Sequence, residues 1–352
     1  MTSMGDHGAR RARAFTYHPF EVALCGPPDA TAALAGRLLQ HWRGRLDVGF
    51  VPHDAPRSAR SGTLPPSRFE RACAFVDADF VLAGEAGSSD LPTLLVLDAE
   101  GQAPQEHAEG RIPNVIGVVG PAGRPATPGE VLPSFSHDDV AGLAAFVEAH
   151  VRARAAAPLY GLVLAGGESR RMGAPKWALD YAGEPHAQRT ARLLGAVCER
   201  VFVSVRPGQE DRRVPGVPAI ADAFPPWGPV AGLLSAMEAY PDAAWLVAAC
   251  DLPFLGEPAL QTLVAGRDPL KIATAFRSAR DGRPEPLCAV WEPRARLRLL
   301  QAAGMGLTCP RRVLEGSAPI LLPPPSAGAL ENANTPAEYH AARAALHRSA
   351  HP

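Results

Sequence analysis

A glycine-rich loop that leaves a short apolar run constrains the fold of this chain more than any other feature. Residues 159–164 read LYGLVL, which is typical of a strand buried in a parallel sheet. The loop, LAGGESRRMGAPK over residues 164–176, contains three glycines, which allow positive φ and close backbone approach. A helical pattern begins near Pro185. Because open α/β sheets bind ligands at the carboxyl ends of their strands, the sequence predicts an α/β fold with a ligand loop here.

The charges of this loop favour a phosphate-bearing ligand. Backbone N–H groups in a glycine-rich loop can cradle phosphates, and Arg170, Arg171 and Lys176 add positive charge. The spacing matches neither the P-loop pattern G-x-x-x-x-G-K-[ST] nor the Rossmann dinucleotide pattern. Any phosphate site in this loop is therefore of another kind.

Composition limits the class of protein. The chain has 352 residues, 47% apolar and 20% charged, which predicts two globular domains. Its net charge of −1 gives no indication of nucleic-acid binding. No apolar run reaches the roughly 18 residues of a membrane span. The six cysteines form no C-x-x-C pair, so we expect them to be reduced in a cytoplasmic protein.

Strands and helices alternate on both sides of an Ala/Arg-rich linker that ends near residue 157. Such alternation indicates parallel sheets covered by helices. We expect a disordered start over 1–19, a first α/β domain over 20–155 and a second over 156–352. Expected strands are 21–25, 46–51, 79–82, 94–97, 115–119, 159–164, 201–205, 245–249, 272–276 and 287–291. Expected helices are 30–40, 137–153, 229–239, 258–265, 293–303 and 336–347.

Two carboxylates follow strands of the second domain. Asp251 stands at the exit of the apolar run 245–249, where a carboxylate can hold Mg²⁺. Its alternative role is to cap the next helix. Asp222 follows another short apolar stretch, and Gly228 then opens a helix whose first N–H groups suit an anion or polar ligand. The alternative for Asp222 is a plain turn residue before a Pro-rich loop.

Two further segments carry candidate polar groups. Thr335 and Glu338 have the spacing of a helix capping box, which leaves Asn332 and Asn334 without a structural role of their own beyond that of turn residues. Arg283 precedes a strand and is either an acceptor-phosphate contact or an exposed loop residue.

The glycine-rich loop resembles the signature L-A-G-G-x-S-x-R-M-G-x-x-K of the nucleotidyltransferases that share the molybdenum cofactor guanylyltransferase (MobA-like) fold. The matching residues are Leu164, Ala165, Gly166, Gly167, Ser169, Arg171, Met172, Gly173 and Lys176. Residues 250–254 are similar to the family's C-D-x-P-[FY], whose aspartate is a Mg²⁺ ligand. Residues 228–233 resemble G-P-[LV]-[AG]-G-[LIM], and residues 332–336 match N-x-N-T-P. The resemblance covers roughly residues 159–345.

This resemblance implies a Rossmann-like, mostly parallel sheet and Mg²⁺-dependent transfer of GMP from GTP to the terminal phosphate of molybdopterin, with release of pyrophosphate. It implies that Lys176, Arg171 and Asp251 are catalytic and that Asp251 holds the metal. The implied nucleotide site comprises Leu164, Ala165, Gly166, Gly167, Ser169, Gly173, Lys176, Asp222 and Gly228. The implied acceptor side comprises Asn332, Asn334 and Arg283. Molybdoenzymes or cofactor-insertion chaperones are the implied docking partners, and the oligomeric state stays open.

Some residues depart from the guanylyltransferase pattern. Pro175 before the lysine resembles the cytidylyltransferase branch, whereas Gly166-Gly167 follows the guanylyl style. Ser204 and Arg206 stand where the family usually has asparagine for guanine. Three alternatives therefore stay open: CTP as the donor, a different small phosphate as the acceptor, or a non-catalytic carrier of the finished cofactor.

The first domain resembles, weakly, the P-loop GTP-binding protein B (MobB-like) of the same pathway. Residues 79–97, 114–119 and 133–143 carry the resemblance. The segment Gly26–Ala32, which follows the first strand, has no lysine and is too short for a Walker A loop. We therefore expect a degenerate P-loop-like α/β domain without GTPase activity, used for docking or dimerisation.

Overall fold

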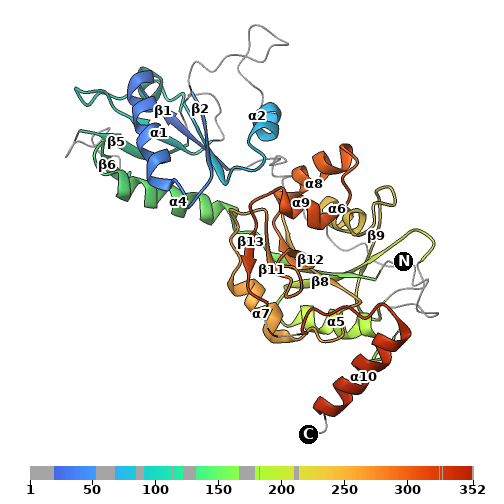
Figure 1. Cartoon of the computed structure of the whole chain (residues 1–352). Helices are drawn as coiled ribbons and strands as arrows, with labels where there is room; N and C mark the ends of the chain where they lie inside the picture. Colours follow the sequence, from blue (N-terminus) through green and yellow to red (C-terminus); the bar gives the residue numbers. More distant parts are fainter. Residues whose placement is uncertain are drawn as a thin grey trace, which may run out of the picture.

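Two β-sheets organise the chain in a computed structural model, which describes residues 20–52, 68–84, 91–112, 114–121, 132–165, 179–181, 183–209, 214–324, 326 and 328–350. Figure 1 shows the first sheet in blue to green and the second in green to red. Both sheets are mostly parallel, which confirms the predicted α/β class.

The first sheet is parallel throughout, in the order β2-β3-β1-β4-β5-β6. Its strands are β1 (Phe20–Cys25), β2 (Val48–Val51), β3 (Phe80–Ala83), β4 (Thr93–Val96), β5 (Val115–Gly120) and β6 (Ser134–Ser136). The helices are α1 (Pro28–Trp42), α2 (Arg68–Ala74), α3 (Gln105–Ala108) and α4 (Val140–Ala155). Helices α1 and α4 pack on the same face, where Leu34, Leu38 and Val147 are fully buried.

The first turn of this sheet is short. Only Gly26 and Pro27 separate β1 from α1, and a β-carbon on Gly26 would lie 2.2 Å from the carbonyl oxygen of Val96. A side chain at position 26 would therefore clash with Val96, while the expectation that residues 26–32 bind no phosphate stays a prediction. The P-loop ancestry of the fold itself stays a prediction. Helix α4 begins at Val140, three residues later than expected, and Asp139 caps it by accepting a hydrogen bond from the Gly142 amide at 2.9 Å.

The second sheet has the order β13-β11-β12-β10-β7-β8-β9, and only β12 runs antiparallel to its neighbours. Its strands are β7 (Leu159–Leu164), β8 (Arg200–Val205), β9 (Ala219–Ala221), β10 (Ala244–Ala249), β11 (Ala273–Arg277), β12 (Pro284–Trp291) and β13 (Ile320–Leu322). Strand β7 is buried at all six positions, as its apolar run predicts. Strands β9 and β13, of three residues each, were not predicted.

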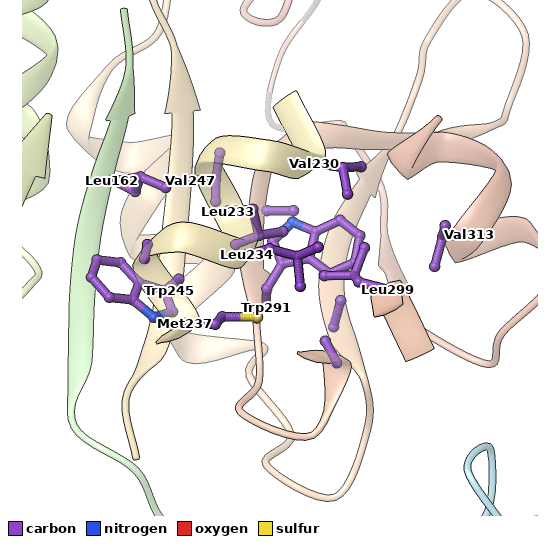
Figure 2. Packing of buried hydrophobic residues seen from close by; sticks show 14 of the residues in the cluster. Leu162, Val230, Leu233, Leu234, Met237, Trp245, Val247, Trp291, Leu299 and Val313 are labelled. Carbon is purple, nitrogen blue, oxygen red and sulfur yellow. The ribbon is translucent and has the colours of Figure 1, made fainter. Parts of the chain in front are cut away.

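Helices cover both faces of the second sheet because its central strands alternate between two cores. In β10, Trp245 and Val247 point to one face, whereas Leu246 and Ala248 point to the other. The first face packs against α6 (Pro229–Ala239), α8 (Ala295–Gly304) and α9 (Pro310–Glu315); Figure 2 shows Trp245 and Trp291 within this core. The second face packs against α5 (His186–Gly195) and α7 (Glu257–Ala265).

The last helix, α10 (Pro336–Ala350), extends outward from the body of the second unit (Figure 1). Tyr339, Ala342 and Leu346 of this helix pack in one small cluster with Tyr181 and Ala333. None of the helices in the described part of the chain has the length and apolar character that crossing a lipid bilayer demands.

Candidate functional site

The strand order brings the predicted site residues to one edge of the second sheet. Strands β10, β7 and β8 are adjacent and parallel, and Ala249, Leu164 and Ser204 lie in register at their carboxyl ends. Asp251 follows β10, and Asp222 follows β9 on the far side of β8. Strand β7 thus ends between the strands that precede the two carboxylates, at the edge where a ligand meets an open α/β sheet.

Most of the predicted loop residues fall outside the described part of the chain. These are Gly166, Gly167, Ser169, Arg171, Gly173 and Lys176. Leu164 and Ala165 are described, and both are buried at the start of the loop. The roles of Leu164, Ala165 and the other loop residues in a nucleotide site stay predictions.

Asp251 lies beside the segment that contains the predicted asparagines. The Ala333 amide donates a hydrogen bond to the Asp251 carbonyl oxygen at 3.0 Å. Asp251 and Asn332 also line the same pocket, which has a volume of about 210 Å³. The pocket is completed by Pro229, Leu252, Glu285, Pro286, Leu287, Cys288, Cys309, Pro310, Arg311 and Leu330. Asp251 and Asn332, which are 81 positions apart in the sequence, thus line the same pocket.

A bulge in β12 aims part of this strand into the pocket. The register between β11 and β12 jumps, so that Ala275 pairs with Ala289 while the next residue, Phe276, pairs with Glu285. Residues 286–288 lie within this jump, and all three line the pocket. The indole of Trp291 donates a hydrogen bond to the Pro286 carbonyl at 3.1 Å, which holds the bulge. Bulges beside a site commonly re-aim side chains in this way.

Two charged pocket residues were missed from the sequence. Glu285 is on β12, and Arg311 is on α9, a helix that was not predicted. The Arg311 guanidinium donates to both carboxylate oxygens of Glu285, at 3.2 and 3.1 Å. Burial raises the pKa of Glu285, and Arg311 partly offsets this effect. The pair places a cation in the same pocket as Asp251 and Asn332.

Arg283, the predicted acceptor contact, is held elsewhere. Its guanidinium donates to both carboxylate oxygens of Glu315, at 2.5 and 3.0 Å. It does not belong to the described lining of the pocket. Arg283 is thus an ion-paired residue near the site, and Arg311 is the arginine that lines the pocket.

Tyr181 and His186 form a neutral backing behind Asp251. Their rings pack edge to face with centroids 4.8 Å apart, and both residues are buried. Burial, together with the neighbouring Tyr339 phenol and the negative charge of Asp251, raises the pKa of Tyr181 to about 12. Burial lowers the pKa of His186 to about 4. Neither side chain adds charge near Asp251 at neutral pH.

Asp222 is joined to β8 through a buried hydroxyl. Ser204 donates from its Oγ to the Asp222 carboxylate at 2.9 Å. Burial raises the pKa of Asp222, while the Ser204 hydrogen bond and the Arg206 charge act in the opposite direction. Helix α6 packs directly over this pair, since a β-carbon on Gly232 would lie 2.4 Å from the Ser204 Oγ. The Ser204 hydroxyl therefore holds the Asp222 carboxylate in place, and its hydrogen is not available to bind a nucleotide base.

Gly228 is required by its backbone at the start of α6. Its φ of 64° and ψ of −139° belong to a region that side-chain-bearing residues rarely adopt. We expect Gly228→Ala to lower the free energy of unfolding by about 1–3 kcal/mol, measured by urea denaturation. Gly256 occupies the same position at α7 with φ −129°, so Gly256→Ala is the matched control. An equal effect of both substitutions would contradict strain at Gly228.

The capping box before α10 is confirmed. Glu338 accepts hydrogen bonds from the Thr335 and Asn334 amides at 2.9 and 2.7 Å, and its own amide donates to the Thr335 hydroxyl at 3.3 Å. The 332–334 segment is therefore held at two points: the capping box binds the Asn334 amide, and the Asp251 carbonyl accepts from the Ala333 amide.

The donor set at Asp251 fits magnesium. Mg²⁺ is held by one or two carboxylates together with substrate phosphates and waters, and the Asp251 carboxylate and the Asn332 amide supply hard oxygen donors to one pocket. Within the described ranges there is no cluster of three or more His, Cys, Asp or Glu side chains suited to a metal. A site of this kind depends on the nucleotide to complete the coordination of the ion.

Comparison with known proteins agrees with this geometry. The model of the MobA-like NTP transferase domain matches residues 161–320. A probable molybdenum cofactor guanylyltransferase from Mycobacterium bovis is 33% identical over 190 residues, which cover 92% of that protein and 52% of this chain. This chain belongs to the MobA-like NTP transferase family. The resemblance seen in the loop signature is thereby confirmed for the second half of the chain.

Further relatives match a similar share of this MobA-like chain. A molybdenum cofactor biosynthesis bifunctional protein from Synechocystis sp. is 38% identical over 183 residues. The match spans 52% of this chain and only about half, 53%, of that protein. Among solved structures, molybdopterin-guanine dinucleotide biosynthesis protein A from Archaeoglobus fulgidus aligns with 54% of the chain, at 22% identity and a TM-score of 0.45.

Proposed function

We propose that this chain transfers GMP from GTP to the terminal phosphate of molybdopterin. The observation that carries the proposal is the joining of Asp251 and Asn332 in one pocket beside the exit of β7, in a member of the MobA-like family. An oxygen of the acceptor phosphate forms a bond to the α-phosphorus of GTP. The bond from that phosphorus to the bridging oxygen breaks, and pyrophosphate leaves with the electron pair.

The protein's contribution is positioning and neutralisation of charge. The acceptor phosphate is already anionic, so no general base is needed. Asp251 would hold Mg²⁺, which neutralises phosphate charge when bound. Lys176 and Arg171 would bind the triphosphate, and Asp222 and Gly228 would shape the ribose and base site. Asn332 and Asn334 would border the acceptor.

We further propose that Arg311, rather than Arg283, meets the acceptor phosphate. Both arginines are paired with glutamates, but only Arg311 lines the pocket with Asp251. We expect Arg311→Gln to raise KM for the acceptor by about tenfold to a hundredfold, the equivalent of one charge-assisted hydrogen bond of about 1.5–3 kcal/mol. KM for GTP should stay unchanged.

Steady-state kinetics with each substrate varied in turn tests this assignment, with Arg283→Gln as the matched control. The control should leave both KM values within about twofold. A rise in acceptor KM caused by Arg283→Gln and not by Arg311→Gln would restore the sequence-based assignment.

The test of the function is product analysis with omission controls. Purified protein, GTP, Mg²⁺ and molybdenum-loaded molybdopterin should give equal amounts of pyrophosphate and dinucleotide, and omission of any one of them should stop both. Tight binding of the cofactor without pyrophosphate release would instead favour the carrier alternative. Docking to molybdoenzymes and a cytoplasmic location remain part of the proposal.

CTP as the donor is the second candidate. Pro175 resembles the cytidylyltransferase branch, and Arg206, directly after β8, stands where the family usually has asparagine for guanine. The two donors differ in the base alone, so the same pocket and metal site would serve either of them.

A further inference from the structure

An interface built from buried charges joins the first unit to the second. Arg294 is 8% exposed and donates hydrogen bonds to the carbonyls of Ala78 in the first unit and Leu270 in the second. The Asp79 side chain is 2% exposed and accepts a hydrogen bond from Lys271 at 2.6 Å. Charges this deeply buried are stable only while paired, so these contacts hold the two units in one arrangement.

Apolar packing and a further ion pair extend the same interface. Leu270 belongs to the second unit by sequence, but it is fully buried in the hydrophobic core of the first, beside Val151 and Ala155 of α4. Arg152 of α4 pairs with Asp268 at 2.5 Å. The first unit is therefore completed by residues from the second.

Every element of this interface lies at the amino edge of its sheet. Asp79 immediately precedes β3, and Lys271 precedes β11, a strand parallel to the central β10. Arg294 follows the end of β12, which is antiparallel and therefore finishes at the amino edge. The two sheets meet through their amino edges, and their carboxyl edges face away from each other.

Strand β12 separates the interface from the candidate site. Glu285, near its start, lies in the pocket with Asp251, whereas Arg294 follows its end in the interface. Pro284 at the start of β12 pairs with Arg277 at the end of β11, and Trp291 at the end of β12 pairs with Ala273 at the start of β11, so the two ends of β12 lie at opposite edges of the sheet. No residue of the first unit is among the described residues that line the pocket.

We infer that residues 20–155 are a fixed base on the amino edge of the transferase sheet, not a lid over its site. To reach the carboxyl edge, the first unit would have to break the Asp79–Lys271 and Arg294 contacts and expose Leu270. Such undocking in each turnover is excluded by the number of buried groups involved. The first unit thus contributes rigidity to the transferase half, and its described residues supply none of the pocket lining.

Thermal unfolding of the full chain tests the docking without reference to activity. The wild-type chain should unfold in a single transition. Arg294→Met should split that transition or lower its midpoint by at least about 6 °C, because Asp79 loses a partner and several carbonyls lose their donor. Arg296→Met is the matched control, since Arg296 lies two residues further along, in the first turn of α8, but pairs with Glu238 within the second unit. It should keep a single transition.

Small-angle scattering tests whether the first unit closes over the site. It uses only the wild-type chain, so the result does not depend on whether a variant folds. The radius of gyration should stay the same with and without saturating GTP and Mg²⁺, with saturation established by calorimetry. A decrease on binding would overturn the inference. A single, unshifted unfolding transition of Arg294→Met would overturn it as well. Neither unfolding result depends on which nucleotide the protein uses.

Discussion

Replacing Asp251 with asparagine is expected to lower kcat/KM for GMP transfer by about a thousandfold. A metal ion at phosphate oxygens contributes several kcal/mol to stabilising the transition state, and about 4 kcal/mol corresponds to that factor. Asparagine keeps the size of the side chain but removes its charge. The main-chain contact from Ala333 to the Asp251 carbonyl survives the substitution, so the fold of the site should persist.

Steady-state pyrophosphate release over a range of Mg²⁺ concentrations checks this expectation. Asp242→Asn is the control, because Asp242 is an exposed turn residue after α6. The control should retain full activity, and both variants should keep the wild-type unfolding midpoint to within a few degrees. Retention of Mg²⁺-dependent turnover by Asp251→Asn, to within a factor of about two, would remove Asp251 from the metal site.

Replacing Trp291 with alanine is expected to lower the free energy of unfolding by about 3–5 kcal/mol, which is the range for deleting a buried aromatic side chain. Trp291 is fully buried between the second sheet and α8 (Figure 2). Its indole also donates the hydrogen bond that holds the Pro286 carbonyl in the bulge. The substitution therefore removes packing and a buried donor together.

Trp291→Phe separates these two contributions. It keeps most of the ring but leaves the Pro286 carbonyl without its indole donor, which should cost about 1–3 kcal/mol. Because the bulge lines the pocket, this variant should also raise KM for the acceptor more than KM for GTP. Urea denaturation and steady-state kinetics measure the two effects. If Trp291→Phe is as stable as the wild type, the indole hydrogen bond does not stabilise the bulge at Pro286.

Local patterns in the sequence predict much of the fold correctly. The two short, continuously apolar runs of residues 159–164 and 245–249 predicted the buried strands β7 and β10. The capping box of Thr335 and Glu338 was readable because its partners lie three positions apart. Strands β9 and β13 were missed because three residues give too short a pattern.

The candidate site was only partly predictable, because its assembly depends on contacts between distant residues. Asp251 was found from its place after a strand and from a motif. Arg311 was missed because its helix, α9, has only six residues. The partner of Arg283 is Glu315, 32 positions away, and nothing local in the sequence indicates such a pairing. For α9, the sequence does contain one local signal: Pro310, because proline favours the first turn of a helix.

Nucleotide selectivity is the most direct measurement of the central claim, that this chain is a guanylyltransferase acting on molybdopterin. GTP, CTP, ATP and UTP would be offered separately with Mg²⁺ and molybdenum-loaded molybdopterin, and pyrophosphate and dinucleotide would be quantified. The account predicts release with GTP and the guanine dinucleotide as the product. Preference for CTP, or no release with any of the four, would contradict it.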